Sequence, residues 1–106
     1  LDSIRPAQQQ SWYCLSAVIE NINADKRNAV VARLNAMGVG TSVYYPQPVP
    51  RLTYYRNKYK RDLTLYPNAA RISDQSIALP VGPHLSPDDM QYVGRCFQKA
   101  CNEEGI

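Results

Sequence analysis

The sequence has no long apolar run and no apolar start. A membrane-spanning helix needs about 20 consecutive apolar residues, and no stretch of the 106 residues approaches that length. The opening LDSIRPAQQQ also lacks the apolar core of a signal peptide. These absences argue against a membrane protein, so we expect a cytoplasmic location and no membrane partner.

Cysteine and histidine are scarce. Cys14, Cys96 and Cys101 show no C-x-x-C spacing, and His84 is the single histidine, so no zinc site is expected. Three cysteines cannot all pair, and we expect reduced, mostly buried thiols. His84 has no Ser or Cys obviously placed beside it, which favours a structural or solvated loop histidine over a catalytic one.

The remaining composition is that of one soluble globular domain. Hydrophobic residues make up 44% of the chain and charged residues 20%, close to the average for such domains. The net charge of +3 and the pI of about 8.9 are mild. This balance does not by itself require a nucleic acid or a membrane as partner.

Residue patterns predict three short strands. Residues 12–20 alternate, with Tyr13, Leu15, Ala17 and Ile19 on one side; residues 41–45 are β-branched and aromatic; residues 76–80 give a third short segment. Helical patterns separate them. The fold class predicted is α+β, with a small three-stranded, mainly antiparallel sheet and helices packed on one face.

Helix signals are clearest at the C-terminal end. Ser86 is expected to cap a helix that has Pro87 at its first position and apolar residues at spacings of three and four. An earlier helix is expected to begin at a cap on Asp25 and to end at Gly38. Its apolar stripe comprises Val30, Val31, Leu34 and Met37. Shorter helical segments are predicted at 52–59 and from Pro67 through Ser73.

No complete active site is evident. The glycines of GVGT at 38–41 follow a helix instead of leading into one, so we interpret them as a helix stop and a turn and not as a phosphate cradle. A Schiff-base lysine must lose its proton, which usually takes burial or neighbouring cations. None of the four lysines, Lys26, Lys58, Lys60 and Lys99, lies in an apolar run. We predict no catalytic, cofactor-binding or metal-binding residue in this chain.

Residues 51–61, RLTYYRNKYKR, combine five basic residues with three tyrosines. Aromatic rings beside cations suit single-stranded nucleic acid, and they also suit a sugar nucleotide with its base and diphosphate. A solvated basic loop with its tyrosines packed inward explains the pattern equally well. One alternative hypothesis is therefore a free-standing α+β module that binds nucleic acid through 51–61; another is a domain that only packs against a partner.

From Gly38 onward the order of motifs resembles the C-terminal domain of the DegT/DnrJ/EryC1/StrS family, sugar aminotransferases with the aspartate-aminotransferase fold. Four ordered pieces carry this resemblance, and the strand and helix predicted in 12–37 also fit it. The pieces are MGVGTSVYYPQPV at 37–49, the segment 54–59, YPNAARIS at 66–73 and IALPVGPHLSPDDMQYV at 77–93.

The resemblance implies a domain organisation and an activity. Residues 1–10 would be a linker or the cut end of a longer chain, and 11–106 a C-terminal small domain, with the large domain that binds pyridoxal phosphate outside this sequence. The intact enzyme would use a lysine aldimine of that cofactor to move an amino group, commonly from glutamate, onto a nucleotide-linked keto sugar for surface-polysaccharide or antibiotic-sugar synthesis. It would be a homodimer, and the fragment alone would be inert.

The resemblance also implies substrate-binding residues. It places Tyr44, Tyr45 and the loop 46–51 at the wall of the substrate cleft, where Arg51 could pair with phosphate. Both tyrosines could equally well pack the domain. The sequence departs from the family pattern, with Tyr44 and Pro50 where histidines are usual and Ala70 where a glutamate is usual. These departures leave the substrate open.

Overall fold

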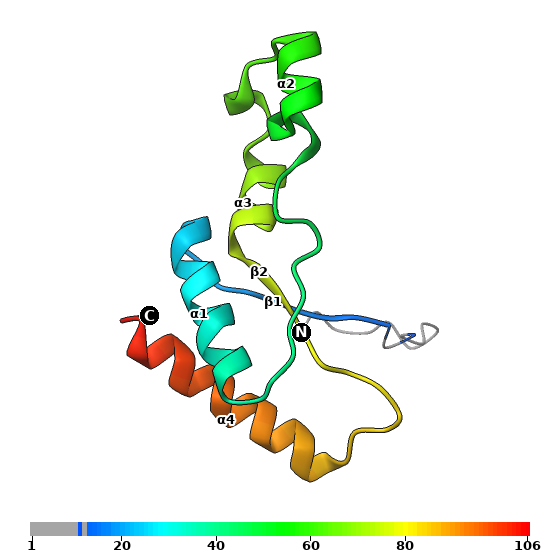
Figure 1. Cartoon of the computed structure of the whole chain (residues 1–106), viewed down its shortest axis with the longest axis vertical. Helices are drawn as coiled ribbons and strands as arrows, with labels where there is room; N and C mark the ends of the chain where they lie inside the picture. Colours follow the sequence, from blue (N-terminus) through cyan, green and yellow to red (C-terminus); the bar gives the residue numbers. More distant parts are fainter. Residues whose placement is uncertain (1–10, 12) are drawn as a thin grey trace, which may run out of the picture.

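The computed structural model describes residue 11 and residues 13–106, so the predicted linker 1–10 lies outside the described residues. A body holds most of the helices and the sheet, and an arm formed by residues 49–66 projects from it (Figure 1). The elements in chain order are β1 (Leu15–Val18), α1 (Ala24–Ala36), η1 (Val49–Arg51), α2 (Thr53–Tyr59), η2 (Leu63–Leu65), α3 (Pro67–Gln75), β2 (Ser76–Leu79) and α4 (Pro87–Glu103).

The sheet consists of β1 and β2, which pair antiparallel with Leu15 opposite Leu79 and Ala17 opposite Ile77. Directly opposite residues point to the same face, so these four side chains share one face. We call this the inner face. The predicted alternation therefore holds from Leu15 to Ile19. It fails at Tyr13, which precedes β1 and is 91% exposed.

The predicted strand at 41–45 is wrong, and the described part of the chain has a sheet of two strands where we expected three. Ser42 forms a single bridge with Ala78, through N–H···O distances of 3.1 Å and 2.7 Å. Beyond it, prolines at 46, 48 and 50 have no N–H to donate to a sheet. The segment therefore leaves the sheet after one bridge. The α+β class itself is confirmed.

The helix boundaries differ slightly from the prediction. The N-cap of α1 is Asn23, whose Oδ1 accepts a hydrogen bond from the Lys26 N–H at 2.9 Å, and Asp25 lies in the first turn. Asp25 is therefore not the cap, although its carboxylate still favours the positive end of the helix dipole. Gly38 follows the helix with φ +78°, as predicted for a helix stop. The predicted Ser86 cap of α4 is confirmed, since Ser86 and Asp89 form a capping box.

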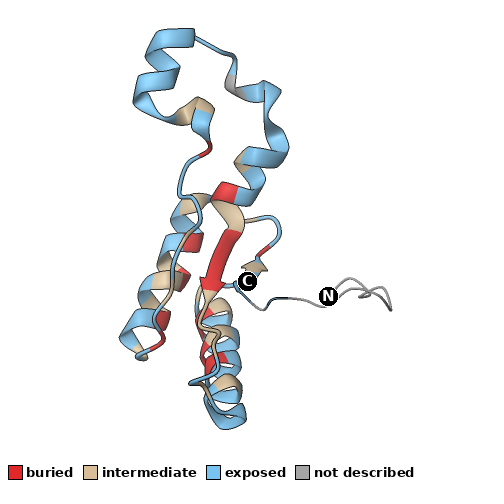
Figure 2. Ribbon diagram, turned by 90° about the vertical axis from the view of Figure 1, so that its right-hand side faces the viewer, coloured by how far each residue is buried: buried red, intermediate tan, exposed pale blue. Residues whose placement is uncertain are grey.

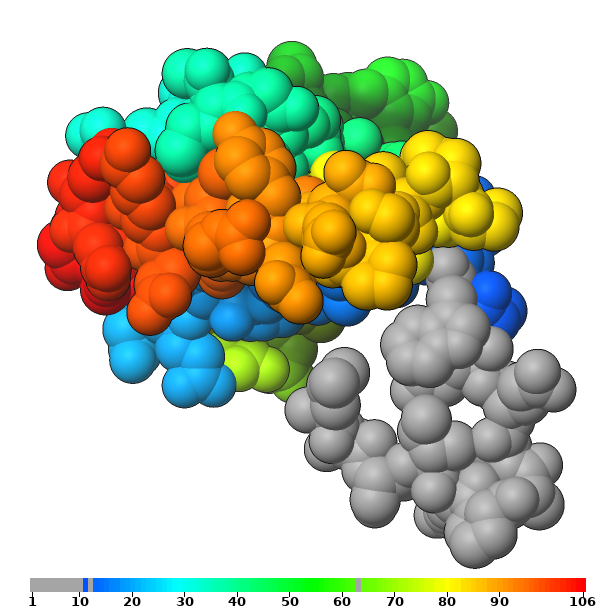
Figure 3. All heavy atoms as spheres, turned by 90° about the horizontal axis from the view of Figure 1, so that it is seen from below, coloured from blue at the N-terminus to red at the C-terminus, as the bar shows by residue number. Residues whose placement is uncertain are grey.

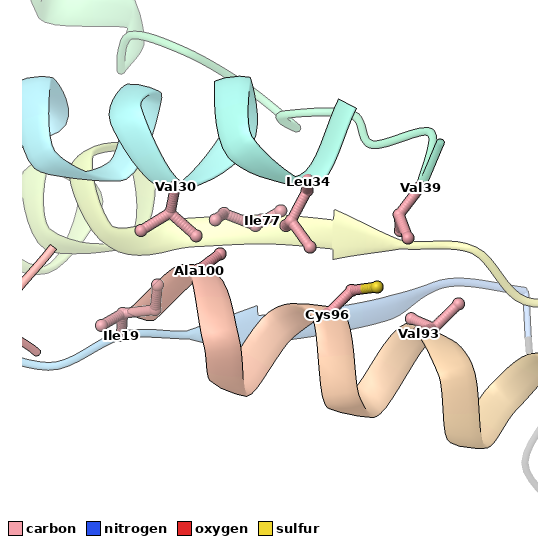
Figure 4. Packing of buried hydrophobic residues seen from close by; sticks show 8 residues of the cluster. All are labelled: Ile19, Val30, Leu34, Val39, Ile77, Val93, Cys96 and Ala100. Carbon is pink, nitrogen blue, oxygen red and sulfur yellow. The ribbon is translucent and has the colours of Figure 1, made fainter. Parts of the chain in front are cut away.

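The core lies between α1, α4 and the inner face of the sheet. Figure 4 shows Val30 and Leu34 of α1 directed toward Ile77, with the buried residues of α4 on the other side. Seen from below, α4 runs across this end of the molecule with α1 beside it (Figure 3). The predicted apolar stripes of both helices therefore face the core. Its buried members are Ile19, Val30, Leu34, Val39, Ile77, Val93, Cys96 and Ala100.

An ionic cluster joins the ends of α1 and α4. Nη1 of Arg33 lies 2.6 Å from Oε2 of Glu103, and Nε of Arg33 donates to Glu104. Lys26 adds a hydrogen bond from Nζ to the Glu104 carbonyl at 2.9 Å. The hydrogen bond to Glu104 raises the pKa of Arg33 above its ordinary value. The side chains of Arg33 and Glu103 are 41% and 40% exposed, so we expect their ion pair to contribute little to stability, whereas Glu104 is half-buried.

The cysteines agree with only part of the sequence-based expectation. Cys96 is buried and Cys101 is half-buried, but Cys14 is exposed, so mostly buried thiols describe the last two alone. Burial raises the pKa of the Cys101 thiol above its ordinary value. None of the helices in the described ranges is long and apolar enough to span a membrane.

The arm has no core of its own. All residues from 52 to 69 whose side chains are described are exposed, and the arm is pale blue almost throughout in Figure 2. Its tyrosines do not pack inward, contrary to one of the interpretations left open for residues 51–61; Tyr54 is 63% exposed and Tyr59 is 52% exposed. The arm is therefore a surface element held at its base.

We expect Leu34→Ala to lower the free energy of unfolding by about 3 kcal/mol, because it opens a cavity at a site with no exposed surface. Gln98→Ala, at an exposed site on α4, should change it by less than about 0.5 kcal/mol. Urea unfolding followed by circular dichroism measures both. Equal losses in the two variants would contradict the assigned core.

Candidate functional site

A groove of ≈ 1020 Å³ separates the start of α1, the loop 44–52 and α3. We call it the main groove. Its volume is at the upper end of the range of roughly 300–1,000 Å³ for small-molecule sites. The lining residues are Ala24, Asp25, Arg27 and Asn28 of α1, residues 44–50 and Leu52 of the loop, and Ala69, Ile72 and Ser73 of α3.

Tyr44 and Tyr45 form one wall of the main groove. They are 57% and 74% exposed, and their rings meet edge to face with centroids 6.1 Å apart. The loop that carries them is stiffened by prolines, and Pro48 is buried. The structure therefore brings together the two tyrosines predicted to contact substrate, with a flat apolar face and a hydroxyl on each. Their contact with a substrate remains a prediction.

Arg51 forms an intramolecular ion pair with Asp74. Its Nη1 donates to both carboxylate oxygens of Asp74, at 2.7 Å and 2.9 Å. Its side chain is not part of the groove lining, although Pro50 and Leu52 on either side are. A phosphate would have to share this guanidinium with Asp74, which occupies Nη1. The pair joins η1 to α3 across 23 residues of sequence, and so fixes the base of the arm.

Arg27 is the groove residue that sequence reasoning missed. It is 2% exposed, donates from Nη1 to the Ser76 carbonyl at 3.3 Å, and donates from Nε to Asn28 at 2.9 Å. Burial lowers the pKa of Arg27, while the nearby charge of Asp74 acts in the opposite direction. The available signal was spacing: Arg27 stands three residues before Val30, in line with the apolar stripe of α1.

The other candidate residues are dispersed. Lys58 lies 5.3 Å from the ring centroids of Tyr54 and Tyr59, and Lys99 lies 3.9 Å from Glu103. His84 is exposed on the loop before α4. Of the positions that depart from the family pattern, Tyr44 and Pro50 line the main groove, and Ala70 is half-buried on α3 beside it.

Comparison with protein families agrees with the motif order. The model of the DegT/DnrJ/EryC1/StrS aminotransferase family matches residues 2–98. The chain belongs to this family. Among curated relatives, the pleiotropic regulatory protein of Geobacillus stearothermophilus is 32% identical over 68% of this chain. The dTDP-3-amino-3,4,6-trideoxy-alpha-D-glucose transaminase of Streptomyces venezuelae is 31% identical over 60% of it.

A solved structure has the same fold in this region. The Streptococcus pneumoniae protein named "Putative sugar aminotransferase Spr1654" matches with a TM-score of 0.77 and 27% identity over 86% of this chain. The matched region is 22% of that protein. This chain likewise spans 19% of the Geobacillus protein and 17% of the Streptomyces transaminase. The resemblance to this aminotransferase family is therefore confirmed, and it concerns about a fifth of each relative.

We expect Asp74→Asn to loosen the arm, because the ion pair with Arg51 anchors its base. The free energy of unfolding should fall by only about 1 kcal/mol, as for a partly exposed pair. Amide hydrogen exchange in α2 should accelerate while that of α4 stays unchanged. Arg56→Gln, on the same arm, is the control. Unaltered exchange in α2 would contradict the anchoring role of the pair.

Proposed function

We propose that residues 11–106 are the C-terminal small domain of an aminotransferase that moves an amino group onto a nucleotide-linked keto sugar, and that 1–10 lead into it from a large domain. The observation that carries this proposal is the family match over residues 2–98, together with a fold likeness confined to about a fifth of the pneumococcal protein. The family match favours this function over a free-standing nucleic-acid-binding module.

Names of the relatives support a sugar substrate. The Streptomyces protein is named as a transaminase of a dTDP-linked amino sugar, and the pneumococcal protein as a sugar aminotransferase. For the intact protein we therefore propose a nucleotide sugar and an amino donor as substrates, in surface-polysaccharide or antibiotic-sugar synthesis. A homodimer in the cytoplasm is part of the same proposal.

Pyridoxal phosphate is the cofactor proposed for the intact enzyme, since the pneumococcal protein has a PLP form and a PMP form. Bound in an aminotransferase, it serves as an electron sink for amine transfer. The described residues do not fit this cofactor by themselves: all four lysines are exposed, and none lines the main groove. We therefore assign this chain no cofactor-binding or catalytic residue and propose that it is inert alone.

The proposed contribution of this chain is to hold the substrate. Tyr44 and Tyr45 offer ring faces to a sugar and hydroxyls to its polar groups. Arg51 could bind a phosphate through the guanidinium donors that Asp74 does not occupy, because only its Nη1 pairs with Asp74. With Tyr44 and Pro50 at the usual histidine positions, a phenol hydroxyl replaces one imidazole on this wall, and the other imidazole has no polar replacement.

The proposal that this chain is catalytically inert by itself is tested with the chain alone. We expect pyridoxal phosphate followed by borohydride reduction to modify the folded chain no faster than the urea-unfolded chain, because all four lysines are exposed in the folded chain. Mass spectrometry of the peptides locates each adduct. A rapid one-to-one adduct at a single lysine, lost on unfolding, would overturn inertness.

The proposal that this chain holds the substrate is tested in the full-length gene product that contains it. We expect Tyr45→Leu to raise KM for the keto sugar about tenfold, equivalent to about 1.4 kcal/mol of lost contact, and to leave the visible absorbance of the bound cofactor unchanged. Tyr13→Leu, on an exposed tyrosine outside the groove, is the matched control. Equal KM values for the two variants would contradict the proposed contact between Tyr45 and the substrate.

A further inference from the structure

The main groove contains a buried positive charge. Arg27 of α1 lines the groove, is 2% exposed and has the largest side chain among the fully buried residues. Ser73 and Ser76 are the other buried polar residues in the described part of the chain. Ser73 also lines the groove, and the Ser76 carbonyl accepts a hydrogen bond from Arg27. The buried polar residues of this domain therefore gather at one place.

No carboxylate forms an ion pair with Arg27 in the part of the chain that the structure describes. Asp74 is near enough to act on its charge, but both carboxylate oxygens of Asp74 accept hydrogen bonds from Arg51. Asp25 also lines the groove; it is exposed, and residues two apart on a helix do not face each other. Burial lowers the pKa of Arg27 in spite of Asp74. The buried charge is therefore only partly compensated.

The guanidinium of Arg27 also has free hydrogen-bond donors. Of its five N–H groups, the one on Nε donates to Asn28 at 2.9 Å and one on Nη1 donates to the Ser76 carbonyl at 3.3 Å. Nη2 has no hydrogen-bond partner among the described residues. Among those residues, Oε1 of Gln75 is the one enclosed side-chain atom that lacks a partner, so Nη2 is not sealed from solvent. A ligand in the main groove can therefore reach these donors.

A purely structural role explains Arg27 poorly. Asn28 is its neighbour in sequence, so the hydrogen bond between them joins no separate elements. The bond to Ser76 joins α1 to the start of β2, but its 3.3 Å is longer than the usual N–H···O distance of about 2.9–3.0 Å. Burial of a charge is unfavourable unless an opposite charge and good hydrogen bonds compensate it. An anion that enters the groove would supply this compensation.

We propose that Arg27 is a substrate-binding residue of the main groove, whose free donors hold an oxyanion: a phosphate of the sugar nucleotide or the carboxylate of the amino donor. A planar guanidinium matches the paired oxygens of both groups. Arg27 comes from α1, whereas Tyr44 and Tyr45 come from the loop 44–52, so one ligand in the groove can contact two of its walls. The identity of the ligand rests on the proposed function, whereas the anion site itself does not.

Titration of the ¹⁵N-labelled chain with inorganic phosphate and, separately, with L-glutamate at constant ionic strength tests the proposal. We expect a saturable shift of the Arg27 Nε–H resonance with at least one of them. Tighter binding of phosphate assigns the site to the sugar nucleotide, and tighter binding of L-glutamate assigns it to the amino donor.

Arg27→Met should weaken binding of the preferred anion at least about tenfold, because charge-assisted hydrogen bonds are the strong ones. The amide shift of Ser73 follows binding in this variant. Arg27→Lys, which keeps the charge without the planar fork, should have an affinity between those of Arg27→Met and the native chain. Arg71→Met is the matched control, since Arg71 is an exposed arginine of α3 that does not line the groove; it should change the affinity less than about twofold.

Urea unfolding without added anions separates binding from a structural role. We expect the midpoint of Arg27→Met to be no lower than that of the native chain, because the replacement removes a partly compensated buried charge. Each of three results would overturn the proposal: no saturable shift of the Arg27 resonance with either anion, equal weakening by Arg27→Met and Arg71→Met, or a lowered midpoint for Arg27→Met with native anion affinity in Arg27→Lys. None of them bears on the proposed aminotransferase function, which is tested separately by the lysine adduct and by KM.

Discussion

Two paired strands of four residues each bury too little apolar surface to be stable in water. The rest of the structure therefore depends on the contact of α1 and α4 with the inner face of the sheet. Leu34 and Ile77 have no exposed surface, and Ala100 closes the same cluster from α4. These are contacts between segments far apart in the sequence, so sheet and helices form together or not at all. The ion pair of Arg33 with Glu103 joins α1 to α4 at the edge of the same interface.

The core also fixes both ends of the segment that builds the site. The chain leaves the core at Val39, which is 3% exposed, and Ser42 ties it to β2 through two hydrogen bonds. It returns at Ser73, which is buried at the end of α3. The main groove therefore has one wall from a loop anchored at its start and another from a helix anchored at its end. Arg27 lies between them and bonds to the Ser76 carbonyl.

Local chemistry was predictable from the sequence, and contacts across the chain were not. The alternation in β1 and the capping box at Ser86 depend on neighbours within a few residues, so both could be inferred. The strand expected at 41–45 failed because β propensity says nothing about whether a partner strand has room or whether prolines end the pairing. The family resemblance pointed to Tyr44 and Tyr45, which line the main groove, whereas the pairing of Arg51 with Asp74 joins residues that no local pattern connects. The exposure of the arm tyrosines likewise depends on which other segments pack against them, and a local sequence pattern does not contain that information.

The Arg51–Asp74 ion pair holds the segment η1, whose residues line two cavities. A helix of seven residues such as α2 is too short to persist alone in water, where roughly 12–15 residues are marginal. Its conformation must therefore come from η1, on which it packs, and from the Arg51–Asp74 pair that holds η1 against α3. Val49 and Pro50, both in η1, line the main groove and also a smaller pocket whose other lining residues are Tyr55, Tyr59, Arg61 and Tyr66. Loss of the Arg51–Asp74 pair would therefore disturb η1, and with it the wall that the two cavities share.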